Sequence, residues 1–139
     1  IKDWITADKP FLGICVGYQL LFEGSEESPS SKGLGIFKGQ NVKFTAEAGL
    51  KIPHMGWNGV TPQQSNHPMW TGMSDEPYFY YVHSFFPRAE EADVVACVTT
   101  YGNQTFHGAV TRGNLIATQF HPEKSQHAGL QLLKNFLAL

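Results

Sequence analysis

The sequence predicts an α/β domain. Three features predict it: an apolar run that ends in a tight glycine turn near the N-terminus, several β-prone segments in the middle, and an amphipathic segment at the C-terminus. Helices at both ends around a set of strands are typical of this class. A length of 139 residues fits one domain, and 42% apolar residues can supply its core.

The N-terminal part of the chain predicts a strand, a helix and a loop. Residues 11–14 form a short apolar run, and residues 16–22 read as a helix whose apolar side is formed by its last three residues. A strand that turns directly into a helix is normally parallel and central in its sheet, with parallel neighbours on both sides. Residues 24–35 are rich in Ser, Glu and Gly and are expected to form an exposed loop.

The rest of the chain predicts further strands and a closing helix. Residues 52–60 are expected to be irregular because they contain one proline and two glycines. The expected strands are 36–37, 42–44, 78–86, 94–100, 106–110 and 115–120. Turn signals at 102–103 and 112–114 separate the last three of them. Residues 126–139 have apolar positions at helical spacing and predict an amphipathic helix.

Composition argues against several classes of function. The formal net charge is −2 and no run of Lys or Arg occurs, so nothing predicts a surface for nucleic acid or for anionic lipid. No apolar stretch approaches the roughly 18 residues of a membrane span, and the first residues do not resemble a signal peptide. The two cysteines, Cys15 and Cys97, are therefore expected to be reduced in a cytoplasmic protein, with a disulfide as the alternative.

Cys15 has the surroundings of a catalytic nucleophile. Gly13-Ile14-Cys15-Val16-Gly17 follows the apolar run and has the form of a nucleophile elbow, in which the glycines remove side chains that would clash. At a helix N-terminus the Cys15 thiolate would be favoured, and the N–H of Val16 could stabilise an oxyanion. The alternative is a buried structural cysteine. Cys97 lies in a Val-rich strand and is expected to be a core residue.

His121 and Glu123 have the pattern of a base and its orienting carboxylate. Pro122 favours an extended conformation at His121, and residues two apart in an extended chain face the same side. The carboxylate could then hold the imidazole so that it activates a thiol. A surface histidine is the alternative. A metal site is a poor rival, because no His/Cys cluster at metal-ligand spacing occurs.

With these residues the chain resembles the class I (triad) glutamine amidotransferases. Within that family it most resembles the glutaminase subunits of imidazole glycerol phosphate synthase. The resemblance covers almost the whole chain and rests on Gly13–Phe22, Pro53-His54-Met55-Gly56-Trp57-Asn58, Tyr81-Val82-His83-Ser84-Phe85 and Gln119-Phe120-His121-Pro122-Glu123-Lys124-Ser125. The first and last of these motifs are typical of triad amidotransferases generally. The Pro-His-Met-Gly-Trp-Asn motif and Lys124, which follows His-Pro-Glu, point to the histidine-pathway subunit.

The resemblance implies a fold. It implies a flavodoxin-like, three-layer α/β fold with a central mixed, mostly parallel sheet, in which residues 1–139 form the C-terminal part of the amidotransferase domain. The family opens with a β-α-β unit whose glycine loop supplies a second oxyanion N–H and part of the glutamine pocket. No residue before Lys9-Pro10 corresponds to that unit, so this chain is expected to be a poor glutaminase by itself.

The resemblance also implies a mechanism without a cofactor or metal. Cys15 attacks the side-chain amide of glutamine, His121 transfers the proton, Glu123 orients His121, and the products are ammonia and glutamate. Gln19 and Ser84 are the expected glutamine-binding residues, although a solvent-facing helix position would also explain Gln19. His83, beside Ser84, is expected to be structural.

A partner is implied as well, because free ammonia would be protonated in water. The resemblance implies a (β/α)8-barrel cyclase subunit that takes up the ammonia, with Trp57, Asn58, Tyr80 and Lys124 near the docking face. Ordinary core packing is the alternative for Trp57 and Tyr80, and a solvated side chain is the alternative for Lys124. Two rival functions stay open: a glutaminase that serves another synthase, and a partner-dependent module with little activity of its own.

Overall fold

The strands of the chain divide among three sheets in a computed structural model that describes residues 1–139. The sheets have the strand orders β1-β10-β9-β8-β5, β2-β3-β7 and β4-β6. The strands are β1 Phe11–Ile14, β2 Gly24–Ser25, β3 Gly39–Lys43, β4 His54–Gly59, β5 Thr61–Pro62, β6 Tyr78–His83, β7 Phe85–Ala89, β8 Val95–Tyr101, β9 Gln104–Arg112 and β10 Leu115–Thr118. The helices are α1 Lys2–Thr6, α2 Val16–Gln19 and α3 Gln126–Leu137, with short 3₁₀ turns at Pro68–Trp70, Ala92–Val94 and Pro122–Lys124.

The prediction of one central, mostly parallel sheet is wrong. In the five-stranded sheet only β1 and β10 run parallel, and every other pair is antiparallel. The reason lies in the connections, because β8, β9 and β10 are joined by turns at 102–103 and 113–114 that are too short for a parallel crossover. Gly102 and Gly113 hold the positive φ angles of these turns, +61° and +56°. β1 therefore lies at an edge of its sheet and not at the centre.

Other differences concern single elements. Residues 52–60, expected to be irregular, contain β4, whose six residues pair with the aromatic strand β6 in antiparallel register. Ile36 and Phe37 form no strand, because both backbone N–H groups donate to the carbonyl of Leu21. The helix expected at 16–22 is shorter and ends at Gln19, and the β-prone stretch 78–86 is divided into two strands at Ser84.

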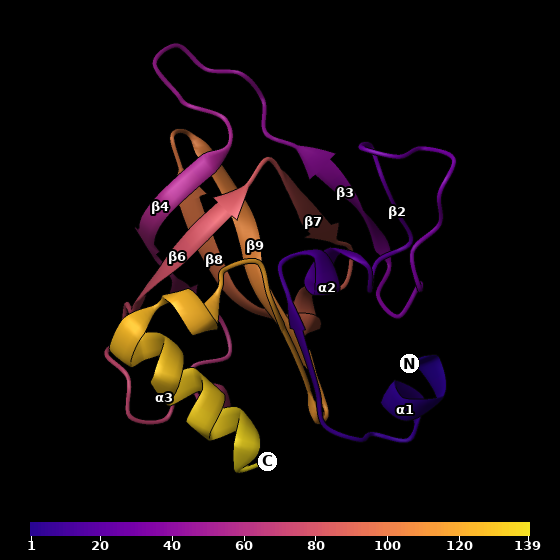
Figure 1. Cartoon of the computed structure of the whole chain (residues 1–139), viewed down its shortest axis with the longest axis vertical. Helices are drawn as coiled ribbons and strands as arrows, with labels where there is room; N and C mark the ends of the chain where they lie inside the picture. The colour runs from indigo at the N-terminus through magenta and orange to yellow at the C-terminus, as the bar shows by residue number, and fades with distance from the viewer.

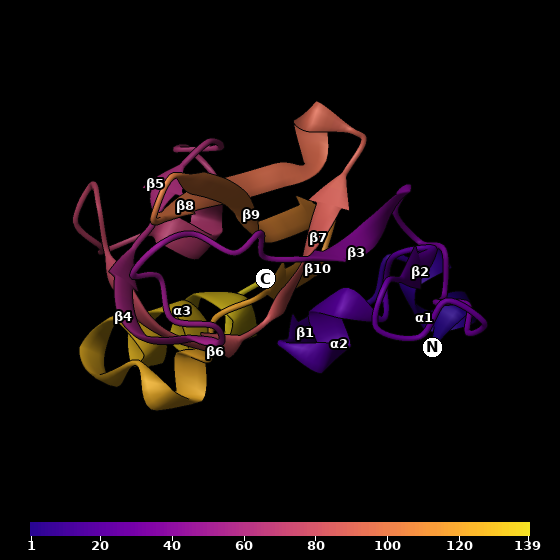
Figure 2. The same ribbon diagram turned by 90° about the horizontal axis from the view of Figure 1, so that it is seen from above.

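Strand β10 separates two hydrophobic clusters. Its alternate residues face opposite sides: Ile116 joins the cluster that contains Leu132 of α3, and Leu115 and Ala117 join the cluster that contains Tyr18 of α2. Figures 1 and 2 show α3 at the left of the molecule and α2 near its middle, next to β1. This packing fixes the carboxyl ends of β1 and β10 beside α2.

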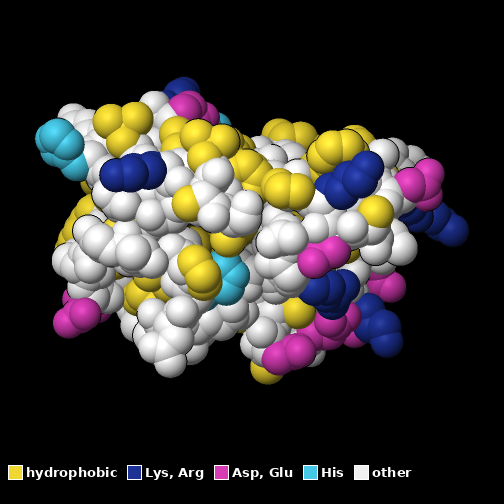
Figure 3. Space-filling view, turned by 90° about the horizontal axis from the view of Figure 1, so that it is seen from below, with side chains coloured by type: hydrophobic (Ala, Val, Ile, Leu, Met, Phe, Trp, Pro, Cys, Tyr) yellow, Lys and Arg dark blue, Asp and Glu magenta, His cyan; other side chains and the backbone are white.

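The surface also exposes large apolar side chains. Figure 3 shows them among charged residues on the face seen from below Figure 1, toward which α1 and the end of α3 lie. Exposed side chains in those two segments include Ile1, Trp4 and Leu137. None of the helices has the length and apolar character that crossing a lipid bilayer would demand.

Candidate active site

Cys15 lies at the turn between β1 and α2. Its backbone has φ +51° and ψ −103°, a left-handed conformation that is rare for a residue with a side chain. The Cys15 N–H donates to the carbonyl of Thr118 at 2.8 Å, which ties the turn to the end of β10. The nucleophile candidate is therefore held by the parallel pair β1–β10.

The two glycines of the elbow do not have equal roles. A Cβ at Gly13 would lie 2.9 Å from the carbonyl oxygen of Gly17 and 3.3 Å from the Cβ of Ala117, so no side chain fits there. A Cβ at Gly17 would meet nothing within 4 Å. The expectation that both glycines prevent a clash is thus wrong for Gly17, which lies on an open side of α2.

The Cys15 thiol is not held as a thiolate. Burial raises its pKa, although hydrogen bonds from the backbone N–H of Val16 and from Gln119 act in the opposite direction. The expected effect of the helix N-terminus is small because α2 has only 4 residues, so few peptide dipoles add up. The thiol contacts the carbonyl oxygen of Val82 at 4.0 Å. An adjacent base is therefore needed to remove its proton.

His121 follows the end of β10 and has one ring nitrogen in use. Its backbone N–H donates to the carbonyl of Tyr80 at 2.9 Å, and the 3₁₀ turn beginning at Pro122 brings Glu123 back toward the ring. The Glu123 carboxylate lies 3.2 Å from Nδ1 of His121. Nε2 is buried without any hydrogen-bond partner, so it is available to a reacting group.

The sheet brings Cys15 and His121 to one edge. Ile14 and Thr118 are register partners in the parallel pair, so both residues lie just beyond the carboxyl ends of neighbouring strands. No hydrogen bond joins Cys15 to His121 in this structure; the Cys15 sulfur instead contacts the carbonyl of Val82 at 4.0 Å and Nε2 of Gln119 at 3.7 Å.

Gln119 is a site residue that sequence reasoning missed. Its side chain is fully buried, and its Nε2 lies 3.7 Å from the Cys15 sulfur. Its Oε1 accepts a hydrogen bond from Nε2 of Gln19 at 3.3 Å. Residues 119 and 120 form a bend after β10, so no simple periodicity of the sequence predicts where the Gln119 side chain lies. Gln119 thus links the nucleophile to α2.

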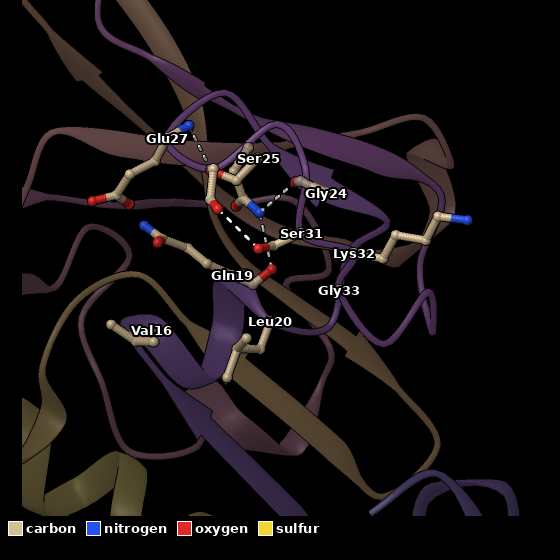
Figure 4. Close-up of a pocket in the computed structure, with 11 residues that line it drawn as sticks. Val16, Gln19, Leu20, Gly24, Ser25, Glu27, Ser31, Lys32 and Gly33 are labelled. Carbon is tan, nitrogen blue, oxygen red and sulfur yellow. Dashed lines mark hydrogen bonds between the residues drawn. The ribbon is translucent and has the colours of Figure 1, made fainter.

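A cavity of about 190 Å³ opens beside α2. Val16 and Gln19 form one wall of it, and the loop after β2 forms the other, as Figure 4 shows. That loop contributes Glu27, an exposed carboxylate that sequence reasoning did not single out. A concave space between a side-chain amide and a carboxylate can hold a small molecule with a cationic amino group.

Ser84 does not line this cavity. It lies at the junction of β6 and β7, where its backbone carbonyl accepts a hydrogen bond from the N–H of Phe44 at 3.1 Å. Its hydroxyl makes no hydrogen bond within the chain. Ser84 therefore lies next to the end of β6, but its side chain forms no hydrogen bond with the other candidate residues.

The four residues expected at a partner interface are arranged differently from one another. Trp57 and Tyr80 are register partners on β4 and β6, with ring centroids 6.3 Å apart, and Trp57 is 47% exposed. Lys124 is exposed on the 3₁₀ turn after His121. Asn58 instead uses its amide inside the fold, where Nδ2 donates to the carbonyl of Thr100 at 2.9 Å.

Further apolar side chains extend this surface. Met55 and Tyr78 are more than half exposed and lie on the same two strands as Trp57 and Tyr80. Val82 pairs with Met55, and its carbonyl contacts the Cys15 sulfur. The outer face of the β4–β6 sheet is thus an apolar strip that reaches the nucleophile. No group of three or more His, Cys, Asp or Glu residues is placed to hold a metal ion.

Known proteins resemble the chain over its whole length. A family model described as glutamine amidotransferase class-I matches residues 1–139. The imidazole glycerol phosphate synthase subunit HisH of Thermosynechococcus vestitus is 50% identical over 139 residues, and the subunit of the same name from Trichodesmium erythraeum is 49% identical over 138 residues. The chain covers 66% and 64% of these relatives, about two thirds of their length.

Solved structures share the fold at low sequence identity. The structure of PurLQS from Thermotoga maritima matches with a TM-score of 0.72 and 16% identity, over 99% of this chain and 65% of that one. The glutaminase domain of CTPS from Trypanosoma brucei, solved with bound acivicin, matches with a TM-score of 0.64 and 14% identity, over 99% of this chain and 63% of that one. These likenesses concern the α/β architecture with its mixed sheets.

Proposed function

This chain belongs to the class-I glutamine amidotransferase family, and from that membership we propose that it carries the glutamine-hydrolysing site of an imidazole glycerol phosphate synthase. One observation carries the proposal. Nε2 of His121 is buried and unpartnered at the sheet edge next to Cys15, while Glu123 holds the opposite ring nitrogen. This arrangement fits a base that must act on a thiol with a raised pKa.

The reaction proceeds through a thioester. Nε2 of His121 takes the Cys15 proton, the sulfur bonds to the side-chain amide carbon of glutamine, and the carbonyl electrons move onto oxygen. The N–H of Val16, which makes no backbone hydrogen bond, donates to that oxyanion. The carbon–nitrogen bond then breaks as the imidazolium returns its proton to nitrogen, and ammonia leaves. Water, deprotonated by His121, adds to the thioester; the carbon–sulfur bond breaks, the thiol regains its proton, and glutamate is released.

The cavity beside α2 is where we place the amino-acid end of glutamine. Nε2 of Gln19 is occupied by the carbonyl of Phe85, at 2.9 Å, and by Gln119, so its Oε1 is left to accept from the substrate ammonium. Glu27 supplies a negative charge on the opposite wall, and Lys32, which lines the same wall, supplies a positive one. The Gln19 oxygen and Glu27 suit an α-ammonium, which donates hydrogen bonds and carries a positive charge, and Lys32 suits an α-carboxylate. Ser84 is proposed to contact glutamine through its backbone, from the junction of β6 and β7 outside the cavity wall.

The partner we propose is a (β/α)8-barrel cyclase that docks over the apolar strip. Released ammonia loses its nucleophilic lone pair once water protonates it, so the acceptor must lie against the site. Trp57 and Tyr80 offer aromatic area on the strip, and Lys124 offers a charge at its rim. The relatives' name, a synthase subunit, supports an assembly of this kind. The chain is proposed to act in the cytoplasm, within histidine biosynthesis.

A second candidate is a module with little activity of its own. It is favoured by the Cys15 thiol, which points to Val82 and not to His121, and whose pKa is raised. In this version the docked cyclase shifts the site toward its reactive arrangement.

Glutamate release separates these candidates. The chain is assayed alone and with a cyclase partner, and Cys15→Ala serves as the inactive control. Turnover that rises on adding the cyclase supports the proposed function, and turnover seen only with the cyclase supports the second candidate. No glutamate in either assay, from folded protein shown to bind the cyclase, contradicts both.

A further inference from the structure

We infer that His83, supported by His54, is a positioning residue that sets the orientation of the Gln19 amide. The inference rests on the proposed function, because Gln19 is taken to hold substrate glutamine. It comes from a continuous series of hydrogen bonds that runs from the β4–β6 sheet to the Cys15 sulfur. Sequence reasoning treated His83 as merely structural.

The series reaches Gln19 through the backbone carbonyl of Phe85. That oxygen accepts from Nδ1 of His83 at 2.9 Å and from Nε2 of Gln19 at 2.9 Å, so both of its lone pairs are used. Gln19 gives its second amide hydrogen to Gln119. The amide is therefore held with nitrogen toward Phe85 and oxygen left for the cavity. Without the fixed carbonyl, the Gln19 amide nitrogen would keep only its longer contact, at 3.3 Å, with the side-chain amide of Gln119.

The same contact determines the tautomers of both histidines. A carbonyl only accepts, so Nδ1 of His83 must carry the hydrogen, and Nε2 of His83 must then accept from Nδ1 of His54, 2.9 Å away. Nε2 of His54 is left to accept from the Nδ2 of Asn58 at 3.3 Å. Every ring nitrogen has one partner with a matching role. A proton added to His83 would place two N–H groups face to face.

The surroundings keep both rings neutral and in place. His54 is 3% and His83 is 6% exposed, and His54 is stacked between Tyr81 and Tyr101, with ring centroids 4.8 Å and 4.0 Å away. Burial lowers the pKa of His54 to about 4 and that of His83 to about 3. A purely structural role could be filled by apolar rings, without burying four ring nitrogens. The hydrogen bond from His83 to the carbonyl of Phe85 explains why two polar rings are buried here.

Nuclear magnetic resonance tests the tautomers in the unmodified chain. Long-range ¹⁵N–¹H correlation spectra near neutral pH distinguish a protonated Nδ1 from a protonated Nε2. We expect Nδ1–H on both His54 and His83. A hydrogen on Nε2 of His83 would mean that it does not donate to Phe85, and the inference would be wrong.

Two substitutions then test the function of the contact. In His83→Asn the side-chain NH₂ stands where Nδ1 stood and can still donate to Phe85, whereas in His83→Gln it stands where Nε2 was and cannot. His107→Asn is the matched control, because His107 is a partly buried histidine whose Nδ1 accepts from the backbone N–H of Ala89, outside this series. Each variant is labelled with a chloroketone analogue of glutamine and, separately, with iodoacetamide.

The readout is the ratio of the two labelling rates at Cys15, because only the chloroketone uses the glutamine pocket. We expect His83→Gln to lower that ratio about 3- to 10-fold, the worth of one hydrogen bond, and to raise KM for glutamine more than it lowers kcat. His83→Asn should restore most of the ratio, and His107→Asn should leave it unchanged.

The outcomes separate the two proposals. If the unmodified chain shows no preference for the glutamine analogue, the proposed function fails, and the inference fails with it. If the unmodified chain shows that preference and His83→Gln keeps it in full, the positioning role is overturned while the proposed function stands. Should both His83 variants fail to fold, the tautomer measurement decides.

Discussion

Cys15 shows how a single residue can be held in an unfavourable conformation by its neighbours. A backbone with φ +51° and ψ −103° lies in a sparsely populated region and costs on the order of 1–3 kcal/mol for a residue with a side chain. The hydrogen bond to Thr118 stabilises that conformation, and so does the close approach of the Gly17 backbone to Gly13. The consequence is a half-buried thiol just beyond the carboxyl end of β1.

Gly13 and Gly17 are therefore expected to respond differently to alanine. Gly13→Ala forces a Cβ to within 2.9 Å of a backbone oxygen and should lower the free energy of unfolding by about 2 kcal/mol. Gly17→Ala meets open space and should leave stability equal or up to about 1 kcal/mol higher, since alanine favours a helix. Urea denaturation of both variants measures the difference. Equal losses of unfolding free energy in the two variants would contradict the view that only Gly13 is sterically constrained.

The two thiols should also differ in reactivity. Cys15 is half-buried, whereas Cys97 has no exposed surface, and burial raises its pKa far above the ordinary range. In native protein, iodoacetamide should modify Cys15 roughly a hundredfold faster or more, because Cys97 reacts only after local opening. Peptide mapping identifies the adduct, and labelling in urea provides the control in which both react. Faster native modification of Cys97 would contradict the assignment of the nucleophile.

Among the helices and strands, the sequence predicted the features that depend on neighbouring residues. The glycine turns at 102–103 and 113–114 were recognised, and they explain why β8, β9 and β10 are antiparallel. β4 was missed because Gly56 and Gly59 weaken its own pattern, and it exists through pairing with β6. The helix after Cys15 was expected to favour the thiolate, but its short length could not be read from sequence. Gln119 and Glu27 lie at the site because of tertiary packing, which no local sequence pattern predicts.

The histidine pair on β4 and β6 should give stability an acid-sensitive component. Both folded pKa values, about 4 for His54 and about 3 for His83, lie below the ordinary 6.5. The unfolded chain therefore binds more protons, so this stability is full above about pH 6.5 and is lost as pH falls toward the folded values. Each ring should lose on the order of 2 kcal/mol between about pH 7 and about pH 5.

The variant His54→Asn isolates one of these contributions. Its amide can still donate to His83 but cannot titrate. Free energies of unfolding from urea denaturation at the two pH values should fall by about 2 kcal/mol less in the variant than in the unmodified chain. Parallel pH dependences would show that His54 titrates normally in the folded protein.

For the molecule as a whole, the site depends on all three sheets. The five-stranded sheet supplies Cys15 and the segment that leads to His121, β7 supplies the carbonyl that holds Gln19, and β6 contacts the thiol. Because α2 is short and the sheets are small, mutual packing and not any single element fixes these positions. The same division leaves β1 at an outer edge.

That edge should make the chain associate with itself. The N–H groups of Phe11 and Cys15 donate to the β10 side, at 3.2 Å and 2.8 Å, so by strand alternation those of Leu12 and Ile14 face outward. An unpaired strand edge is a template for another chain. Sedimentation velocity should show mass increasing with concentration. Amide hydrogen exchange should be fast at Leu12 and Ile14 in dilute protein and slow at both in concentrated protein, while Gly13 stays protected throughout. A chain that remains monomeric at all concentrations, or exchange that is uniform along β1, would show that this edge is not a template.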